Sequence, residues 1–355
     1  MARKAVRLAD IAKKLNVSTV TVSNALANQK GVSGELREKI RKTAQEMGYQ
    51  PVNSGSAKVT ANIGVIIHEK YLDNHMTFYW KLYQELVVAC TERGSFLLFE
   101  LLNQEAEREL ELPLIVRERK VDGLIVMGEL SRAYLRRLEE VQMPLLFMDF
   151  YAGGFDEDCV ISDNFYGMHT MTRYLVKKGH RNIAYVGSVF SNSSITDRYF
   201  GYLKAVRQYG LPERADWIVD DRDRDFRFLP KLPLPKKLPT AFVCNCDLVA
   251  SDVIKQLEQM GYRIPEDISI VGYDNFLFTG LSSIGITTYA VDMPEMARAA
   301  ADRMLARISR TAKGTGRLTV ISGSMVEKES VRDLTAGAGG EMLPESYERS
   351  GGIIE

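Results

Sequence analysis

The sequence predicts an all-α helix-turn-helix head followed by an α/β body of two doubly wound lobes. In residues 1–50, three short segments show apolar residues at helical spacing. From residue 62 onward, short apolar runs alternate with helical stretches, which indicates mostly parallel sheets with helices on both faces. At 355 residues the chain is long enough for two or three globular units.

The stretch V-S-T-V-T-V-S-N-A-L, residues 17–26, has the composition of a strand, but its surroundings predict a helix. A first helix is expected over residues 8–15, and Ser18 then stands at an N-cap position. Ser33 is a second N-cap candidate, for a third helix that ends at Gly48. In a helix-turn-helix, the second helix lies in the DNA major groove. The side chains expected to pack the second helix against the first are Val17, Val20, Ala25 and Leu26.

The predicted body contains two successive series of strands and helices. Four prolines forbid most of a helix in residues 230–239. The cleft between the lobes is the expected small-molecule site, because ligands bind beyond the carboxyl ends of the strands in such sheets. The predicted strands are residues 62–68, 95–100, 121–127, 144–150, 182–187, 217–219, 240–244 and 268–271, with a further strand near 160, and the predicted helices are residues 78–93, 105–119, 131–141, 165–178, 196–210 and 247–260.

The net charge of zero hides an uneven distribution of charge along the chain. Residues 1–50 contain ten Lys or Arg against four acidic residues, and the rest of the chain is acidic by the same margin. This indicates a head that binds a polyanion, although a basic face that only contacts solvent remains the alternative. Without a membrane-spanning run or a secretory signal, we expect a cytoplasmic protein with four reduced cysteines.

The sequence offers little support for catalysis, and we expect no catalytic residue, metal or cofactor. Phosphate-binding G-x-x-x-x-G-K-[ST], G-x-S-x-G and H-E-x-x-H motifs are all absent, and the four histidines are dispersed. A sugar-modifying enzyme on this fold is one alternative, and a transport-type sugar-binding protein is another. The basic head argues against the second.

Motifs throughout the chain resemble the lactose/galactose repressor (LacI/GalR) family of transcription regulators, from about Val6 to Val331. They include L-A-D-I-A-K-K-L-N-V-S-T-V-T-V-S-N-A-L and M-G-Y-Q-P in the head, and L-V-K-K-G-H-R-N-I-A-Y-V-G and I-P-E-D-I-S-I-V-G-Y-D-N in the body. The resemblance implies a homodimeric repressor that binds double-stranded operator DNA, with a body of periplasmic-sugar-binding-protein type whose effector changes DNA affinity. It implies a head at 1–50, a linker at 51–61, a body at 62–334 and a flexible tail at 335–355. Lobe 1 is then about 62–153 plus 289–322, and lobe 2 about 154–288 plus 323–334.

The resemblance also assigns DNA-contacting residues in the head. Asn24 stands where many relatives carry Arg, and because Asn pairs well with adenine and Arg with guanine, we expect an altered base preference there. The alternative is that Asn24 only touches phosphate or water. The linker has no leucine to insert into the minor groove, contains Gly55, and offers only Val59 as a poor substitute. The base-reading positions are Thr19, Val20 and Asn24, and the backbone-contacting positions are Leu8, Ser18, Thr21, Ser23 and Ser33.

The effector implied by the resemblance is a carbohydrate or a sugar derivative. Carboxylates and an arginine at strand ends suit sugar hydroxyls, and an arginine can equally hold a carboxylate or phosphate. Aromatic residues at the start of the first body helix could stack on a sugar ring, although Phe78 could instead pack in the core or at a dimer face. Residues 78–93 and 105–119 are the expected dimer faces. The expected effector contacts are Phe78, Tyr79, Trp80, Asp149, Ser194, Arg198, Asp247 and Asp274.

Overall fold

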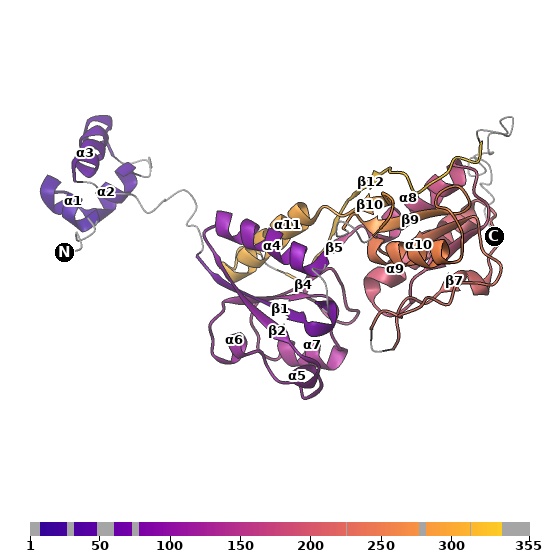
Figure 1. Cartoon of the computed structure of the whole chain (residues 1–355). Helices are drawn as coiled ribbons and strands as arrows, with labels where there is room; N and C mark the ends of the chain where they lie inside the picture. The colour runs from indigo at the N-terminus through magenta and orange to yellow at the C-terminus, as the bar shows by residue number, and fades with distance from the viewer. Residues whose placement is uncertain are drawn as a thin grey trace, which may run out of the picture. The chain divides into compact units, whose positions relative to one another are not determined.

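The computed structural model describes residues 8–26, 32–47, 60–72, 78–224, 226–276, 282–312 and 314–335. The chain divides into two units, Met1–Thr60 and Ala61–Glu355, each of which is described by itself (Figure 1). Most of the predicted linker and of the predicted tail lies outside the described residues, and so do Gly48, Gly55 and Val59. Within the ranges given, no helix is long and apolar enough to cross a membrane.

The first unit contains the three predicted helices. Asn16 makes the turn after the first helix with a positive φ of 52°, a conformation that Asn tolerates better than most residues. The backbone N–H of Val17 then donates to the carbonyl of Ala12 at 3.0 Å. The helices are α1 (Leu8–Leu15), α2 (Thr19–Leu26) and α3 (Gly34–Glu46).

Both predicted N-caps of the head are confirmed. The Ser18 hydroxyl oxygen accepts a hydrogen bond from the N–H of Thr21 at 3.0 Å, and that of Ser33 accepts one from the N–H of Leu36 at 3.4 Å. Each serine therefore satisfies an N–H that has no partner within its own helix. These caps explain how a β-branched segment starts as a helix.

A small apolar core joins the three helices, and it corrects one expectation about α2. Val20 is 65% exposed, whereas Val22 and Ala25 are fully buried. An α-helix turns by about 100° per residue, so Val22, Ala25 and Leu26 share one face and Val20 lies on the opposite one. The prediction that Val20 packs against the first helix is therefore wrong. The buried residues of this core are Ile11, Ala12, Val22, Ala25, Ile40 and Ala44.

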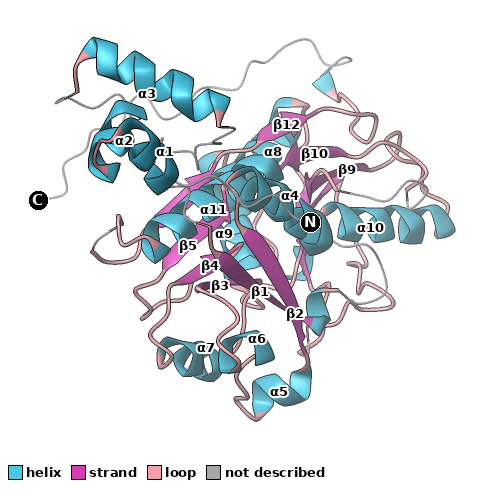
Figure 2. Ribbon diagram, turned by 90° about the vertical axis from the view of Figure 1, so that its left-hand side faces the viewer, coloured by secondary structure: helices cyan, strands magenta, loops and turns pink. Residues whose placement is uncertain are grey.

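The second unit contains two six-stranded sheets. The first has the strand order β11-β5-β4-β3-β1-β2, and all its strands pair in parallel. In Figures 1 and 2, α4 and α11 cover one face of this sheet, and α5, α6 and α7 lie on the other side. Its strands are β1 (Asn62–His68), β2 (Phe96–Leu102), β3 (Gly123–Met127), β4 (Leu145–Met148), β5 (Asp158–Ser162) and β11 (Leu318–Ile321), and its helices are η1 (Glu69–Tyr71), α4 (Phe78–Glu92), α5 (Gln104–Arg108), α6 (Leu114–Arg117), α7 (Arg132–Glu139) and α11 (Met293–Ile308).

The second sheet has the order β12-β10-β9-β8-β6-β7, with β12 antiparallel to β10. Alternate side chains of its strands face opposite layers, as the two-residue repeat of a strand requires. Ala184 and Val186 pack in one core with α10, whereas Ile183 and Tyr185 pack in another with α8 and α9. Its strands are β6 (Ile183–Val186), β7 (Ile218–Val219), β8 (Ala241–Cys244), β9 (Ser269–Asp274), β10 (Thr287–Ala290) and β12 (Ser324–Val326), and its helices are α8 (Asn164–Lys177), α9 (Ser193–Gln208), η2 (Ala215–Trp217) and α10 (Asp247–Gln259).

The two sheets correct the expected lobe boundaries. Strand β5 pairs with β4 and β11 in the first sheet, so lobe 1 extends to residue 162 and does not stop near 153. Strand β10 belongs wholly to the second sheet, so the chain returns to lobe 1 after residue 290, close to the expected return at about 289. A strand followed by a helix looks alike in either lobe, because the pattern does not say which sheet the strand joins.

Two further expectations concern helices. The single helix expected over residues 105–119 is wrong, because the chain forms two short helices, α5 and α6. Leu110 adopts a positive φ of 57° between them, and Pro113, which has no N–H to continue a helix, precedes α6. In the proline-rich segment, the described residues between η2 and α10 form no helix, as predicted.

Candidate functional site

The exposed face of α2 carries the side chains expected to read DNA bases. Thr19, Val20 and Ser23 are exposed, and Asn24 is half-exposed. Val20 and Asn24 are four residues apart, so they lie one above the other on the face opposite the head core. This face therefore presents an amide, a hydroxyl and an apolar group together.

Four of the five positions expected to contact the DNA backbone lie at a helix start or in the first turn of a helix, whereas Ser23 lies in the middle of α2 with an exposed side chain. Ser18 Oγ lies 2.8 Å from the hydroxyl oxygen of Thr21 while it accepts the Thr21 N–H. In this pair one hydroxyl hydrogen is used and the other stays available to an acceptor such as a phosphate oxygen. Leu8 is half-buried against the head core and opens α1, where the first N–H groups lack helical partners. Ser33 is exposed at the start of α3.

In the body, Asp149 joins the two lobes. It follows β4 and is 5% exposed. One of its carboxylate oxygens, Oδ2, accepts a hydrogen bond from the Tyr79 hydroxyl of α4 at 2.8 Å, and its backbone carbonyl accepts one from Ser194 of α9 at 2.8 Å. Burial raises the pKa of the Asp149 carboxyl, and the positive charge of Arg198 opposes this shift. The other oxygen, Oδ1, is buried and has no hydrogen-bond partner in the part of the chain that the structure describes.

Arg198 of α9 is a buried cation whose positive charge acts on Asp149. Its Nε donates to Asn164 Oδ1 at 2.8 Å, and its Nη1 donates to the carbonyl of Asn245 at 2.9 Å. The guanidinium lies over the ring of Tyr273, 4.0 Å from the centroid. Asn164 Nδ2 in turn donates to the hydroxyl of Ser194 at 3.3 Å, so the same network returns to Asp149.

Asp247 and Asp274 form an acidic pair at the carboxyl ends of strands β8 and β9 in the second sheet. A Cβ on Gly272 would lie only 1.9 Å from Asp247 Oδ1, so the close approach of α10 to β9 requires glycine there. Burial raises the pKa of Asp274 to about 7. Burial and the neighbouring Asp274 charge raise the pKa of Asp247 well above its usual range. Near neutral pH the pair therefore retains at least one proton, which can be donated to a ligand oxygen.

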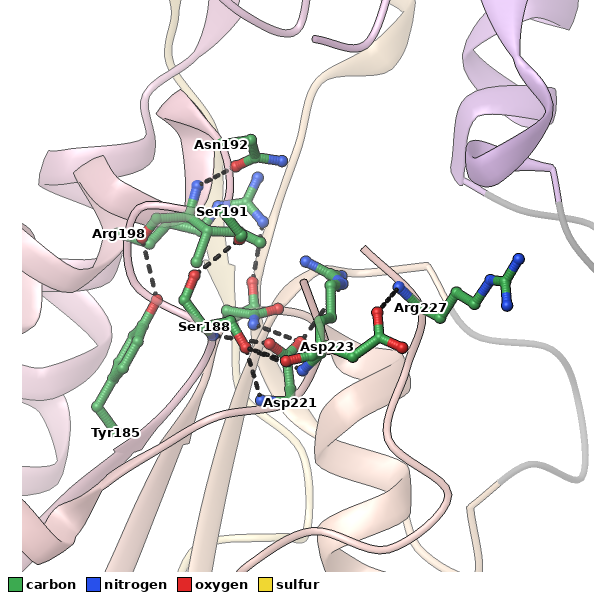
Figure 3. A network of polar contacts seen from close by, with 11 residues as sticks. Tyr185, Ser188, Ser191, Asn192, Arg198, Asp221, Asp223 and Arg227 are labelled. Carbon is green, nitrogen blue, oxygen red and sulfur yellow. Dashed lines mark hydrogen bonds and ion pairs between the residues drawn. The ribbon is translucent and has the colours of Figure 1, made fainter. Parts of the chain in front are cut away.

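Sequence reasoning missed a third group of polar residues, which continues from Arg198 (Figure 3). Asp221 accepts the N–H of Ser188 at 2.7 Å and the side-chain amide of Asn245 at 2.8 Å. Arg222 follows directly, with its Nε 3.6 Å from Asp221 Oδ2. The signal in the sequence is the acidic and basic run D-D-R immediately after the β7 strand.

The three aromatic residues at the start of α4 do not act alike. Tyr79 reaches Asp149, whereas Trp80 packs against Tyr83 and against Phe99 of β2, with ring centroids 5.5 and 6.3 Å apart. The Phe78 ring meets that of Tyr79 edge-on at 5.5 Å. We therefore leave Trp80 out of the candidate effector site. Elsewhere in the described ranges, no group of three or more His, Cys, Asp or Glu residues could hold a metal ion.

Two segments of the chain match known families. Residues 7–52 match the family described as bacterial regulatory proteins, lacI family, and residues 172–331 match a periplasmic binding protein-like domain. The chain is 28% identical over 333 residues to the HTH-type transcriptional repressor PurR of Erwinia tasmaniensis, covering 91% of this chain and 96% of that protein. It is 29% identical over 311 residues to a repressor of the same name from Actinobacillus pleuropneumoniae, covering 84% and 90%.

Solved structures of similar fold include three regulators. A complex of the transcriptional regulator CelR with cellobiose has a TM-score of 0.65 at 21% identity, covering 92% of this chain and 99% of that one. The lac repressor dimer bound to operator and the anti-inducer ONPF has a TM-score of 0.62 at 21% identity, covering 93% and 100%. A LacI family regulator from Enterococcus faecium with bound ribose has a TM-score of 0.61 at 22% identity, covering 77% and 99%. At these identities the similarity shows a shared fold.

Proposed function

The chain belongs to the LacI family of bacterial regulatory proteins, and from this premise we propose how its residues divide the work of DNA binding and effector sensing. It is a DNA-binding transcriptional repressor that a small-molecule effector regulates. The basic head and the exposed face of α2 support the proposal that the head binds double-stranded operator DNA in the cytoplasm.

We propose that Thr19, Val20 and Asn24 read bases. The exposed position of Val20, opposite the head core, supports a contact with a base edge such as a thymine methyl group. Asn24 can make two hydrogen bonds to adenine, a contact worth about 1–3 kcal/mol of discrimination. The predicted backbone contacts of Leu8, Ser18, Thr21, Ser23 and Ser33 then hold α2 in register.

The proposed effector is a carbohydrate or sugar derivative bound where the lobes meet. The observation that carries this proposal is the buried Oδ1 of Asp149, which has no partner among the described residues and can accept a hydrogen bond from a ligand hydroxyl. Arg198, Asp247 and Asp274 surround the same network with donors and acceptors. Structural neighbours described with cellobiose or ribose add support.

We propose a homodimer through α4 and the edge strand β2. Among the described strands, β2 pairs only with β1 and ends the first sheet, so its outer edge is open there. Large apolar side chains on and near these elements are exposed, as a protein interface requires. They are Val88, Phe96, Leu101 and Leu114, with exposed fractions of 52%, 65%, 47% and 52%. A dimer places two heads on the two halves of a partly symmetric operator.

Effector binding and operator binding are then linked. An effector that favours one arrangement of the lobes changes the operator affinity by some factor, and operator binding changes the effector affinity by the same factor.

Thermal-shift measurements on the full chain test the sensing part. A compound at 100 times its dissociation constant adds about 2.7 kcal/mol to the stability, so a sugar or sugar derivative that binds should raise the melting temperature clearly. If no neutral or charged sugar does so, the carbohydrate proposal fails. Operator affinity that barely falls between 50 and 200 mM salt would contradict the phosphate contacts of the head.

A further inference from the structure

Arg222 is a buried cation whose hydrogen-bonding capacity is largely unused. Its side chain is 8% exposed, and neither Nε nor Nη1 has a hydrogen-bond partner among the described residues. These two atoms carry three of the five N–H donors of a guanidinium. Buried donors without partners are costly, so their persistence indicates a group that arrives from outside the protein.

Among the described residues, the acidic neighbour that forms an ion pair with Arg222 is Asp221, and both of its carboxylate oxygens already accept hydrogen bonds. Asp221 Oδ1 accepts the N–H of Ser188, and Asp221 Oδ2 accepts the amide of Asn245. Its 3.6 Å distance to Arg222 Nε is too long for a hydrogen bond. Turning the carboxylate toward Arg222 would break both of these shorter contacts. Asp221 therefore balances the charge of Arg222 without using its donors.

Aromatic rings hold the guanidinium of Arg222 at the junction of the two lobes. It lies 4.6 Å from the ring centroid of Phe226 and 4.4 Å from that of Phe228. From lobe 1, the Tyr71 ring meets Phe226 edge-on at 5.3 Å, and Lys70 Nζ lies 5.4 Å from the centroid of Phe226. Two cations, one from each lobe, therefore converge on one ring.

The Arg222 group is also connected to the proposed effector site. The side-chain amide of Asn245 donates a hydrogen bond to Asp221, and the backbone carbonyl of Asn245 accepts one from Arg198. Arg198 is part of the network around Asp149. Asn245 Oδ1 is buried and has no partner. A ligand held by Asp149 and Arg198 could therefore also reach the unpartnered polar atoms of Asn245 and Arg222, which lie further along the same network.

From these contacts we infer that the effector carries an oxyanion, a carboxylate or a phosphate, which Arg222 binds with paired hydrogen bonds. The inference rests on the proposed function and narrows the effector from carbohydrates in general to sugar acids or sugar phosphates. A planar guanidinium matches the geometry of either oxyanion. Lys70 would add a second positive charge from the facing lobe.

The test compares matched compounds on the full chain. Melting temperatures are measured with neutral sugars and with the acid and phosphate of each, for example glucose, gluconate, glucuronate and glucose 6-phosphate. Each stabilising compound is then titrated by calorimetry against wild type, Arg222→Gln, Arg222→Lys and the control Arg227→Gln. Arg227 lies in the same loop with an exposed side chain.

We expect an acid or phosphate to bind at least tenfold more tightly than its neutral parent. Arg222→Gln should weaken it about 30-fold or more, the lower end of what truncating one partner of a buried charge pair costs. Arg227→Gln should leave it unchanged. If Arg222→Gln does not fold, Arg222→Lys carries the test, because an ammonium keeps the charge but loses the paired bonds, and we expect about a tenfold weaker binding. Whether acids or phosphates bind separates the two oxyanions.

Two outcomes would overturn the inference while the proposed function stands: a neutral sugar that binds as tightly as its acid, or an acid whose affinity is the same in wild type and both Arg222 variants. If no compound of either kind binds, the proposed carbohydrate effector fails and this inference fails with it.

Discussion

The head and the junction of the two lobes differ in the exposure of the polar side chains that are proposed to bind ligands. The head holds a short helix on a core of six buried apolar side chains and leaves its reading groups exposed. The lobe junction buries its charged groups, Asp149, Arg198, Asp247 and Asp274. Removing a buried charged side chain changes both the stability of the protein and its affinity for a ligand, whereas removing an exposed base-contacting side chain changes only the affinity for DNA. Substitutions at the two sites should therefore differ in kind.

The largest expected effect comes from removing the buried Arg198. Arg198→Leu leaves Asn164 and Asn245 without their partner and removes the positive charge facing Asp149, so we expect a loss of about 3–5 kcal/mol in the free energy of unfolding. Urea unfolding followed by circular dichroism measures it.

The matched control for this change is Arg207→Leu on the same helix, whose partner Glu213 is at the surface. It should leave the unfolding midpoint unchanged. Equal losses in both variants would show that burial does not distinguish the lobe junction.

The second test sets two valines of α2 against each other. Val22→Ala removes fully buried methyl groups from a small core and should cost the head about 2 kcal/mol of stability. Val20→Ala should leave stability unchanged and lower operator affinity. Thermal melts and fluorescence anisotropy with labelled operator DNA, run on both variants, give the two readouts. A destabilised Val20→Ala would place that side chain in the core after all.

The third test concerns Asn24 and specificity. Asn24→Arg should move the preferred base at one position of each half-site from adenine toward guanine, by about 1–3 kcal/mol of discrimination. Binding-site selection with both proteins measures the shift. A requirement for guanine already present in the wild type, and unchanged in Asn24→Ala, would contradict base reading by Asn24.

The smallest effect is a pH dependence of the body. The pKa of Asp274 is about 7 in the folded protein, above its ordinary value near 3.8. The folded state therefore binds a proton more tightly than the unfolded chain, and the stability present at low pH is lost as pH rises through about 7. We expect the free energy of unfolding to fall by on the order of 1 kcal/mol between pH 6 and pH 8. Asp274→Asn should reduce this dependence of the free energy of unfolding on pH. An unchanged pH dependence in that variant would show that Asp274 is not the titrating group.

The sequence predicted the head well because its signals are local. Caps at Ser18 and Ser33 and the helical spacing of apolar residues depend on neighbours a few positions away. The error at Val20 came from weighing residue type over helical angle. The family motifs also led to Asp149, Arg198 and Asp274, which the structure connects through buried contacts and charges.

What the sequence could not predict depends on pairing across long separations. Strand β5 lies between β4 and β11 in the first sheet, and its pairing with β11 joins residues more than 150 positions apart. The environment of Arg222 requires Ser188, Asn245 and Tyr71, which come from separate segments of both lobes. A charged run after a short strand gives no sign of which of its members is buried.

We propose that effector binding at the lobe junction is coupled to operator binding by the head. The most direct measurement is the operator dissociation constant, titrated with the compound that most raises the melting temperature, together with the affinity of that compound with and without operator. We expect both affinities to change by the same factor, in either direction, and Arg198→Leu to abolish the change. Operator affinity that stays constant at saturating compound would contradict it.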